Sequence, residues 1–230
     1  SFLFVVLLVN TAYFDIFYLL KKFKIYFLFK LVMSNPNLFF STPVWVSKID
    51  NYKETNEKIY HYIKNLHSED NKGIVKSNVK GWHSNNFNLK DENVIEFINL
   101  ITPNINNVLN DMNWDISKQK ANISAMWAII NIGGASNSRH HHGNSDISAA
   151  YYVRAPKNCG EIVFYDPRPA PVYFHPLSTK PNSLNAMQNA VNPVEGGLVL
   201  FPSYLDHSVN PNLSNEERIV ISFNINLIKK

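Results

Sequence analysis

The sequence predicts an α+β fold, in which a jelly roll of two β-sheets packs against helices from the N-terminal half. Three observations lead to this prediction. Apolar residues recur at helical spacing in two stretches before Trp114. After Trp114 this spacing stops, and short runs rich in β-branched and aromatic residues follow. Clusters of Gly, Pro and Asn separate these runs, as is typical of the turns in a sandwich or barrel.

The N-terminal half contains one expected strand and two expected helices. Residues 39–46 are aromatic and β-branched, and Pro43 favours a position at the edge of a sheet. Residues 51–66 place apolar side chains on one helical face, namely Tyr52, Ile59, Tyr62, Ile63 and Leu66. Asp91 is expected to cap a second helix, whose apolar residues continue to Leu109.

The C-terminal half contains the other expected strands, at 123–132, 147–153, 161–165, 198–201 and 218–225. One connection, 167–193, is long, contains six prolines and has no periodicity. Connections of this length are functional lids or plain insertions, and the residues leave both interpretations open. We predict a single domain over 33–230, with helical support from 33–115 and a jelly-roll core from 116–230.

The first 32 residues differ from the rest, because two apolar stretches flank Lys21, Lys22 and Lys24. A membrane anchor with a basic flank fits this pattern, although Asp15 lies inside the span. A signal peptide would need a small-x-small cleavage site, and none stands out. The third interpretation is a non-native extension, since the segment from Met33 resembles an ordinary start. All three interpretations of 1–32 stay open.

The composition is that of a globular protein, with 45% hydrophobic and 17% charged residues. The net charge of +4 is mild, and no basic run is interleaved with aromatics, so there is no strong nucleic-acid signal. The single cysteine, Cys159, cannot form an internal disulfide and fits a reducing compartment, with a structural role favoured over a nucleophilic one. We therefore expect a cytoplasmic protein, attached to a membrane only if 1–32 is an anchor.

Three consecutive histidines form the first part of a candidate metal site. In a strand, residues two apart point to the same face, so His140 and His142 can reach one metal ion while His141 points away. Two imidazoles alone are also consistent with a polar surface cluster. A third histidine, His207, follows the apolar run 198–201. The three together predict a metal site.

Arg218 adds a cation to this site. If the chain forms a hairpin centred near Asn212, His207 and Arg218 are cross-strand partners. A guanidinium group can hold a carboxylate through two hydrogen bonds. A small diacid would then chelate the metal at one end and meet Arg218 at the other, as a 2-oxoglutarate-dependent iron site requires. The competing interpretation is a surface ion pair of Arg218 with Glu216 or Glu217.

An ordered set of motifs extends over most of the chain, from Leu38 to Asn226. The motifs are Phe40-x-Thr42-Pro43-Val44-Trp45, Gly81-Trp82-His83-Ser84, the His-x-His followed by Ser148-x-x-Tyr151-Tyr152, Gly160-x-Ile162-x-Phe164-x-Asp166-Pro167-Arg168, Pro193-x-Glu195-Gly196, Phe201-Pro202-Ser203-x-x-x-His207-x-Val209, and Glu217-Arg218 through Ser222-Phe223-Asn224. In this order they resemble the 2-oxoglutarate/Fe(II) oxygenases, within them a branch common in bacteria and phages, with similarity to the prolyl-hydroxylase-like members.

The resemblance implies a double-stranded β-helix that binds Fe(II) and 2-oxoglutarate. It implies that His140 and His207 are metal ligands. His142 stands where most of the superfamily has an aspartate or glutamate. The third ligand is therefore either His142 or a nearby carboxylate such as Asp146. We favour His142, because strand alternation gives it the same face as His140.

The resemblance also implies the residues that bind the cosubstrate. Tyr152 corresponds to a tyrosine that hydrogen-bonds the far carboxylate of 2-oxoglutarate, and Asn131 lies near a second polar contact. Together with Arg218 they form the predicted cosubstrate site, and no acid–base catalyst is expected beyond the metal ligands. The predicted activity is that of a dioxygenase that hydroxylates a substrate and releases succinate and carbon dioxide. Small molecule, protein side chain and nucleobase all remain open as substrates.

Two other functions remain compatible with the sequence. The first is a cupin-like metalloenzyme that uses the three histidines without 2-oxoglutarate, in which Arg218 would be dispensable for binding a cosubstrate. The second is a non-catalytic jelly-roll binding module, in which the histidines are structural. In that case His207→Ala would change little besides stability.

Overall fold

The computed structural model describes residues 36–169 and 176–230. The chain divides into two compact units, Ser1–Ser41 and Thr42–Lys230, and the second unit contains all of the helices and strands given below. The interpretations offered for residues 1–32 lie outside the described residues. Within the two described ranges, no helix is both long enough and apolar enough to cross a membrane.

Two antiparallel sheets form the core of the second unit. The larger sheet has the spatial order β1 (Trp45–Lys48), β9 (Gly197–Pro202), β6 (Ile147–Arg154), β11 (Arg218–Lys229), β4 (Gln119–Asn131) and β3 (Trp82–His83). The smaller sheet has the order β2 (Asn78–Val79), β5 (Ser136–His140), β10 (His207–Val209), β7 (Ile162–Tyr165) and β8 (Gln188–Val191). Strands distant in sequence alternate across both sheets, so the predicted double-stranded β-helix is confirmed.

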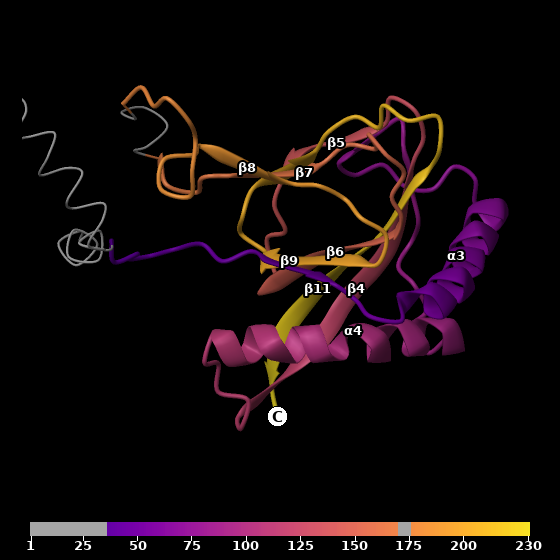
Figure 1. Cartoon of the computed structure of the whole chain (residues 1–230). Coiled ribbons are helices and arrows are strands. Elements are labelled where there is room, and N and C mark those ends of the chain that lie inside the picture. Colours follow the sequence, from indigo (N-terminus) through magenta and orange to yellow (C-terminus); the bar gives the residue numbers. More distant parts are fainter. Residues whose placement is uncertain (1–35, 170–175) are drawn as a thin grey trace, which may run out of the picture. The chain divides into compact units, whose positions relative to one another are not determined.

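Two helices, α3 (Tyr52–Glu69) and α4 (Glu92–Asp111), lie against the larger sheet on the side away from β5, β7 and β8 (Figure 1). Both were expected from their apolar spacing. Asp91 caps α4 as predicted, because its carboxylate accepts a hydrogen bond from the backbone N–H of Asn93 at 2.9 Å. The molecule therefore has three layers, with the larger sheet in the middle.

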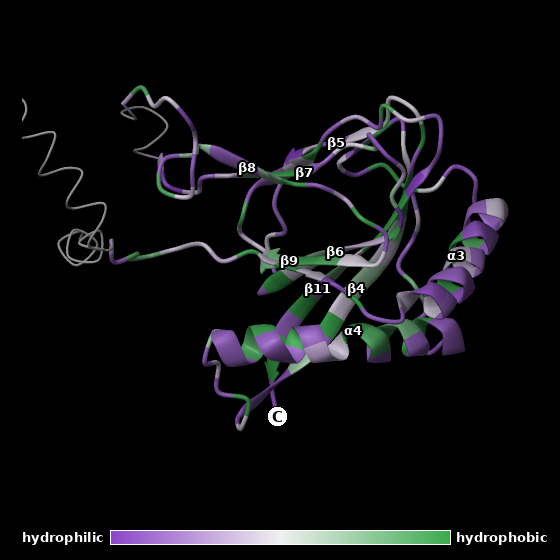
Figure 2. Ribbon diagram, in the orientation of Figure 1, coloured by the Kyte–Doolittle hydropathy of each residue, from purple (hydrophilic) through white to green (hydrophobic). Residues whose placement is uncertain are grey.

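The central strands of the middle layer are largely apolar (Figure 2), and β6 and β9 are buried along almost their whole length. In β6, Tyr151 points to the helices, where its ring meets Phe97 edge-on and its hydroxyl donates to Asn56 Oδ1 at 2.6 Å. The next residue, Tyr152, points the other way and packs in a second cluster with Phe201 and Val220. Alternation along a strand buried on both faces thus separates the structural core from the space between the sheets.

The predicted hairpin between His207 and Arg218 is wrong. His207 pairs with His140 of β5 and Phe164 of β7, so both edges of β10 are occupied within the smaller sheet. Arg218 pairs with Asn131 of β4 in the larger sheet. The segment between β10 and β11 therefore crosses from one sheet to the other, and His207 and Arg218 belong to opposite sheets.

Several strands have other bounds than predicted. β1 begins at Trp45, later than expected, and β4 extends back to Gln119, because its first residues pair with β11 although they are polar and solvent-exposed. Within 167–193, the last residues form the edge strand β8, which pairs with β7. Residues 170–175 lie outside the described residues.

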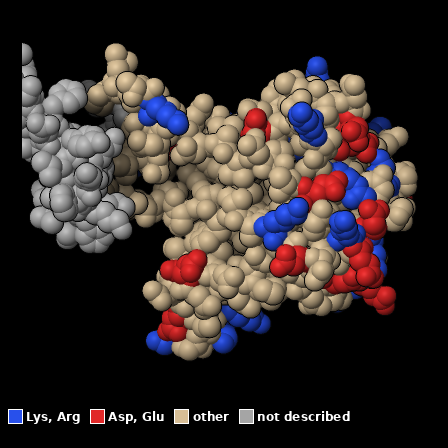
Figure 3. Space-filling model, in the orientation of Figure 1, with Lys and Arg blue, Asp and Glu red and all other residues tan. Residues whose placement is uncertain are grey.

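Charged side chains gather over α3 and its surroundings on the face seen in Figure 3. Both signs are intermixed there. Lys58 lies 3.0 Å from both Glu54 and Glu96, and Arg154 lies 2.6 Å from Glu57. This face therefore offers no continuous basic surface to a nucleic acid.

Phe97 packs α4 against the sheet, with T-shaped ring contacts to Tyr151 and Phe223. It is fully buried, so Phe97→Ala is expected to lower the free energy of unfolding by about 3–5 kcal/mol. Ile95→Ala, on the exposed side of the same helix, should cost far less. Denaturant unfolding of both variants checks this, and equal losses would contradict the assigned packing.

Candidate metal centre

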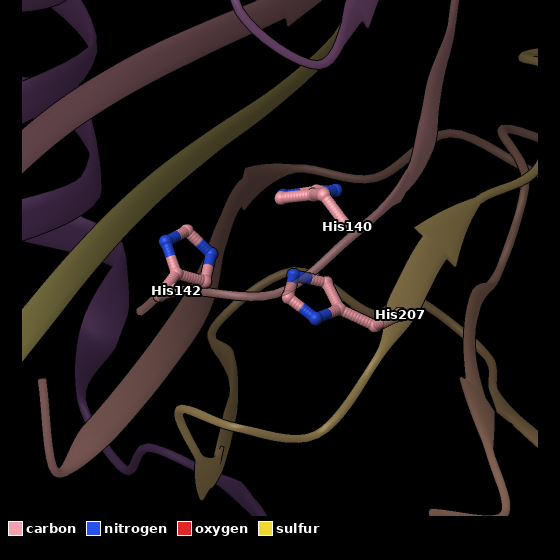
Figure 4. Close-up of side chains that lie close together, drawn as sticks. All are labelled: His140, His142 and His207. Carbon is pink, nitrogen blue, oxygen red and sulfur yellow. The ribbon is translucent and has the colours of Figure 1, made fainter. Parts of the chain in front are cut away.

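Three imidazole side chains meet between the two sheets (Figure 4). His140 ends β5 and His207 begins β10, and the two residues are direct partners in the antiparallel ladder. His142 follows two residues after His140. One ring nitrogen from each histidine lies within 4.8 Å of those of the other two, and the ring centroids are 4.3–5.2 Å apart. Among the described residues, no other group of three or more His, Cys, Asp or Glu side chains is arranged to hold a metal ion.

Two of the three rings are oriented by backbone carbonyls. His140 Nδ1 donates to the carbonyl of Ser138 at 2.7 Å, and His207 Nδ1 donates to that of Leu205 at 2.9 Å. A carbonyl oxygen can only accept, so Nδ1 carries the hydrogen and Nε2 keeps its lone pair. This fixes the tautomer that metal-binding histidines need.

His142 lies beyond the end of β5, so strand alternation alone does not explain its direction. Its backbone N–H donates to the carbonyl of Ser203 at 2.9 Å, which ties the turn after β5 to the segment after β9. Its ring lies 5.7 Å from the Trp127 ring and is stacked against His207 at 5.2 Å. Backbone pairing and ring packing together keep His142 on the side of the other two histidines.

The carboxylate of Asp146, the alternative third ligand, is engaged in a hydrogen bond to the backbone. Its carboxylate accepts a hydrogen bond from the backbone N–H of Leu227 at 2.7 Å, and its own N–H donates to the carbonyl of Ile225. Both bonds tie Asp146 to the edge of β11, and it is not a member of the histidine group. The arrangement therefore favours His142 over Asp146.

A buried hydrogen-bond network supports the turn that carries His142. The hydroxyls of Ser148 and Ser203 lie 2.7 Å apart, and the Ser148 hydroxyl donates to Asn224 Oδ1 at 2.9 Å. Both serines are almost fully buried. The network joins β6, β11 and the segment that accepts the His142 N–H, so it fixes the carbonyl on which His142 depends.

Burial keeps the three imidazoles neutral. Desolvation, followed by repulsion from the neighbouring rings, lowers the pKa of His142 to about 4. Desolvation, followed by His140, lowers the pKa of His207 to about 3. The pKa of His140 is also lowered, with desolvation as the first cause. Neutral imidazoles are the form that coordinates a metal ion, so no proton has to leave at neutral pH.

The histidines line a cavity of about 700 Å³, a typical size for a ligand-binding pocket. Arg218, Val220 and Ser222 point into it from alternate positions of β11. Arg218 is only 1% exposed, so the surface ion pair considered from sequence is wrong, and Glu217 instead pairs with Lys64 at 3.0 Å. The cavity thus brings the imidazoles and a buried cation together.

The Arg218 guanidinium is anchored on one side only. Its Nη1 donates to the carbonyls of Cys159 and of Gly160, the latter at 2.8 Å. Among the described residues, no carboxylate lies within ion-pair distance of it, and burial lowers its pKa. A buried cation without a counter-charge is costly unless an anion joins it. An anionic ligand at this site would therefore offset the cost of burying the Arg218 charge.

The two other predicted cosubstrate residues differ in position. Tyr152 is buried and lines the cavity from β6. Burial raises its pKa, so the hydroxyl stays a donor. Asn131 is buried but is not among the lining residues, and its amide donates to Asn137 Oδ1 at 3.1 Å. The geometry supports Tyr152 and gives Asn131 no direct contact with the cavity.

Two lining residues had no predicted role at this site. Trp127 was predicted only to lie in a strand, and His83 was noted only within a motif. The two rings are stacked at 5.6 Å and form one wall of the cavity. The signal was present in the sequence, because Trp127 and Ile129 alternate in an apolar strand and both reach the cavity.

Residues 125–224, from β4 to β11, match the protein family described as "Putative 2OG-Fe(II) oxygenase". The matched segment contains the three clustered histidines, Tyr152 and Arg218. Residues 125–224 belong to the 2OG-Fe(II) oxygenase family. Fe(II) and 2-oxoglutarate are the cofactors that this family name specifies, and they agree with the prediction. A comparison with curated proteins finds no match to this chain.

Solved structures similar to this chain include a prolyl-4-hydroxylase from Pseudomonas putida, with a TM-score of 0.58, 13% identity, and coverage of 81% of this chain and 93% of that chain. A prolyl hydroxylase from Trichoplax adhaerens, in complex with a hypoxia inducible factor peptide, has a TM-score of 0.56, 13% identity and coverage of 80% and 84%. HygX from Streptomyces hygroscopicus, with nickel, 2-oxoglutarate and hygromycin B, has a TM-score of 0.55, 11% identity and coverage of 80% and 83%. At these identities the likeness shows the fold alone.

The network under His142 can be tested by its stability. Ser148→Ala removes a buried hydroxyl that joins the buried Ser203 to the half-buried Asn224, so we expect a loss of about 1–3 kcal/mol in the free energy of unfolding. Ser124→Ala is the control, because this serine is exposed and makes only a 3.4 Å contact. Denaturant unfolding measures both, and an unchanged Ser148→Ala would show that the network is not needed.

Proposed function

We propose that the protein is an Fe(II)/2-oxoglutarate-dependent dioxygenase that hydroxylates a substrate and releases succinate and carbon dioxide. The observation that carries this proposal is Arg218, a buried cation without a counter-charge in the cavity that the three histidines line. A metal site alone would not need this cation. A cosubstrate with one carboxylate near the metal and another near Arg218 accounts for both features.

The donor set fits the metal. We assign His140, His142 and His207 as ligands through Nε2, because Nδ1 of the first and third is committed to a carbonyl. Three ligands on one side leave coordination positions open, as a non-haem iron oxygenase needs. When bound, Fe(II) and 2-oxoglutarate supply the oxidising chemistry. The protein supplies neutral donors, their orientation and a largely apolar enclosure.

Arg218 and Tyr152 are assigned to the far carboxylate of the cosubstrate. Arg218 approaches from β11 and Tyr152 from β6, and these neighbouring strands present both side chains to the cavity. The carbonyls of Cys159 and Gly160 hold one guanidinium nitrogen and leave the rest of the group for the ligand. Arg218 would thus orient the far carboxylate of the cosubstrate, and the histidines would hold the metal ion that its other end chelates.

The alternative of a three-histidine metalloenzyme without 2-oxoglutarate makes no use of Arg218. The alternative of a binding module makes no use of the carbonyl-fixed ring tautomers. One experiment separates all three functions. Fe(II) and then 2-oxoglutarate are added without oxygen, and the visible charge-transfer band of the metal-bound keto acid is recorded.

We expect the band in the wild-type protein. Arg218→Ala should bind 2-oxoglutarate roughly 30-fold more weakly or worse, since loss of a buried charge-pair partner costs about 2–5 kcal/mol. Arg154→Ala is the matched control, because Arg154 lies outside the cavity and pairs with Glu57. A wild-type protein that binds Fe(II) but gives no band would contradict the proposal. Succinate formation on admitting air then tests turnover.

Asp206 forms a clamp on the outer side of the metal centre. Its carboxylate accepts from Arg139, with nitrogen–oxygen distances of 2.7 and 2.9 Å, and lies 3.0 Å from Nδ1 of His141. Arg139 also lies over the Tyr165 ring, 4.1 Å from its centroid. Asp206 precedes one ligand, His207, and its two partners flank another. The clamp therefore holds β5 and the start of β10 in register.

Asp206→Ala should weaken the binding of Co(II) about 10-fold, the lower end of the effect seen when support of metal ligands is removed. Glu217→Ala is the control, since it breaks a comparable ion pair with Lys64 away from the cavity. Anaerobic titration of each protein with Co(II), followed by its visible absorption, gives the dissociation constants. Equal Co(II) dissociation constants for Asp206→Ala and wild type would show that the interactions of Asp206 do not support the metal ligands.

A further inference from the structure

We propose that the substrate carries an anionic group, a carboxylate or a phosphate, and that Lys76 binds this group at the cavity. The inference rests on the proposed function and deepens it, because it names the chemical class of the molecule that shares the cavity with the cosubstrate. It depends on where Lys76 lies, on the charges of the lining residues, and on the space that the cosubstrate leaves.

Lys76 belongs to a short segment, residues 74–77, that joins the edges of the two sheets. The backbone N–H of Ile74 donates to the carbonyl of His83 in β3 at 2.9 Å. At the other end, the carbonyl of Ser77 accepts from the backbone N–H of Ser138 in β5 at 2.8 Å. Ile74, Lys76 and Ser77 all line the cavity. The backbone that carries Lys76 is therefore held in place on both sides of the opening between the sheets.

The Lys76 ammonium has no acidic partner in the described part of the chain. Its charge contributes, after desolvation, to the lowered pKa of His83, so it acts on the cavity wall. An unpaired ammonium beside a wall of buried aromatic rings is a position where an anion gains an ion pair without first breaking one.

The charges of the lining residues all have one sign. Lys76, Arg139 and Arg218 line the cavity, and none of its described lining residues is Asp or Glu. Asp206 already neutralises Arg139, and the cosubstrate neutralises Arg218 under the proposed function. Of these three cations, Lys76 is the one that has neither an acidic partner among the described residues nor a carboxylate of the cosubstrate beside it. Three neutral imidazoles also leave one more positive charge at the metal than two imidazoles and a carboxylate would, which again favours an anion.

The cavity has room and polar groups for a second ligand. At about 700 Å³ it lies in the upper part of the range for small-molecule pockets, and 2-oxoglutarate has only ten non-hydrogen atoms. The lining also includes Ser77, next to Lys76 in the chain, and Asn85 and Asn86, whose amides can donate further hydrogen bonds to an anion. Trp127 and His83 provide a flat surface for an apolar portion.

The test compares probes of the same shape and different charge. The protein is loaded without oxygen with Co(II) and 2-oxoglutarate, and benzoate, phenyl phosphate or neutral benzamide is added. Broadening of the probe's proton resonances by the paramagnetic Co(II) reports binding near the metal. The Co(II) absorption spectrum, recorded with and without 2-oxoglutarate, shows whether the cosubstrate stays bound. The variants are Lys76→Ala, Lys76→Arg and, as control, Lys90→Ala, which does not line the cavity.

We expect benzoate and phenyl phosphate to bind the wild type at least 10-fold more tightly than benzamide does. Lys76→Ala should lose most of this preference, whereas Lys76→Arg and Lys90→Ala should keep it. The proposal is overturned if benzamide binds as well as the anions, if no anion binds, or if Lys76→Ala keeps the preference. Failure of the proposed function is a separate result, because then 2-oxoglutarate leaves the Co(II) spectrum unchanged before any probe is added.

Discussion

The pairing of β5 with β10 is the interaction on which the site depends. It sets His140 directly opposite His207, although the two residues are far apart in the sequence. Both edges of β10 are paired, with β5 and with β7, so a shift in register would break two ladders at once. The larger sheet then adds Arg218 from the opposite side of the cavity. The β-helix therefore places His140 and His207 on one sheet and Arg218 on the other.

The electrostatics of the cavity follow from this division. His207 is buried and His140 and His142 are half-buried, so desolvation holds all three neutral and ready to bind a metal. Arg218 is held by main-chain carbonyls rather than by a carboxylate, so it keeps its full charge for a ligand. A carboxylate beside Arg218 would have satisfied the cation and left the cosubstrate without a partner. The absence of acidic lining residues among those described is thus part of how the site works.

Local patterns were sufficient to predict much of this structure. The apolar spacing of α4 and the capping by Asp91 are properties of adjacent residues, and both were confirmed. The grouping of the three histidines also followed from sequence, although His142 is held by the Ser203 carbonyl rather than by strand alternation. The pairing of His207 with Arg218 was wrong, because strand partners are chosen by long-range topology that the turn residues do not encode. The position of Lys76 at the cavity was missed for the same reason.

X-ray absorption at the iron edge tests the central claim, that three imidazoles and a ligand held by Arg218 form the metal site. The protein is loaded with Fe(II) without oxygen, and the spectrum is measured for the wild type and for His142→Ala. The account predicts three imidazole ligands in the wild type and two in the variant. Two imidazoles and a protein carboxylate in the wild type, with a spectrum that His142→Ala leaves unchanged, would contradict it.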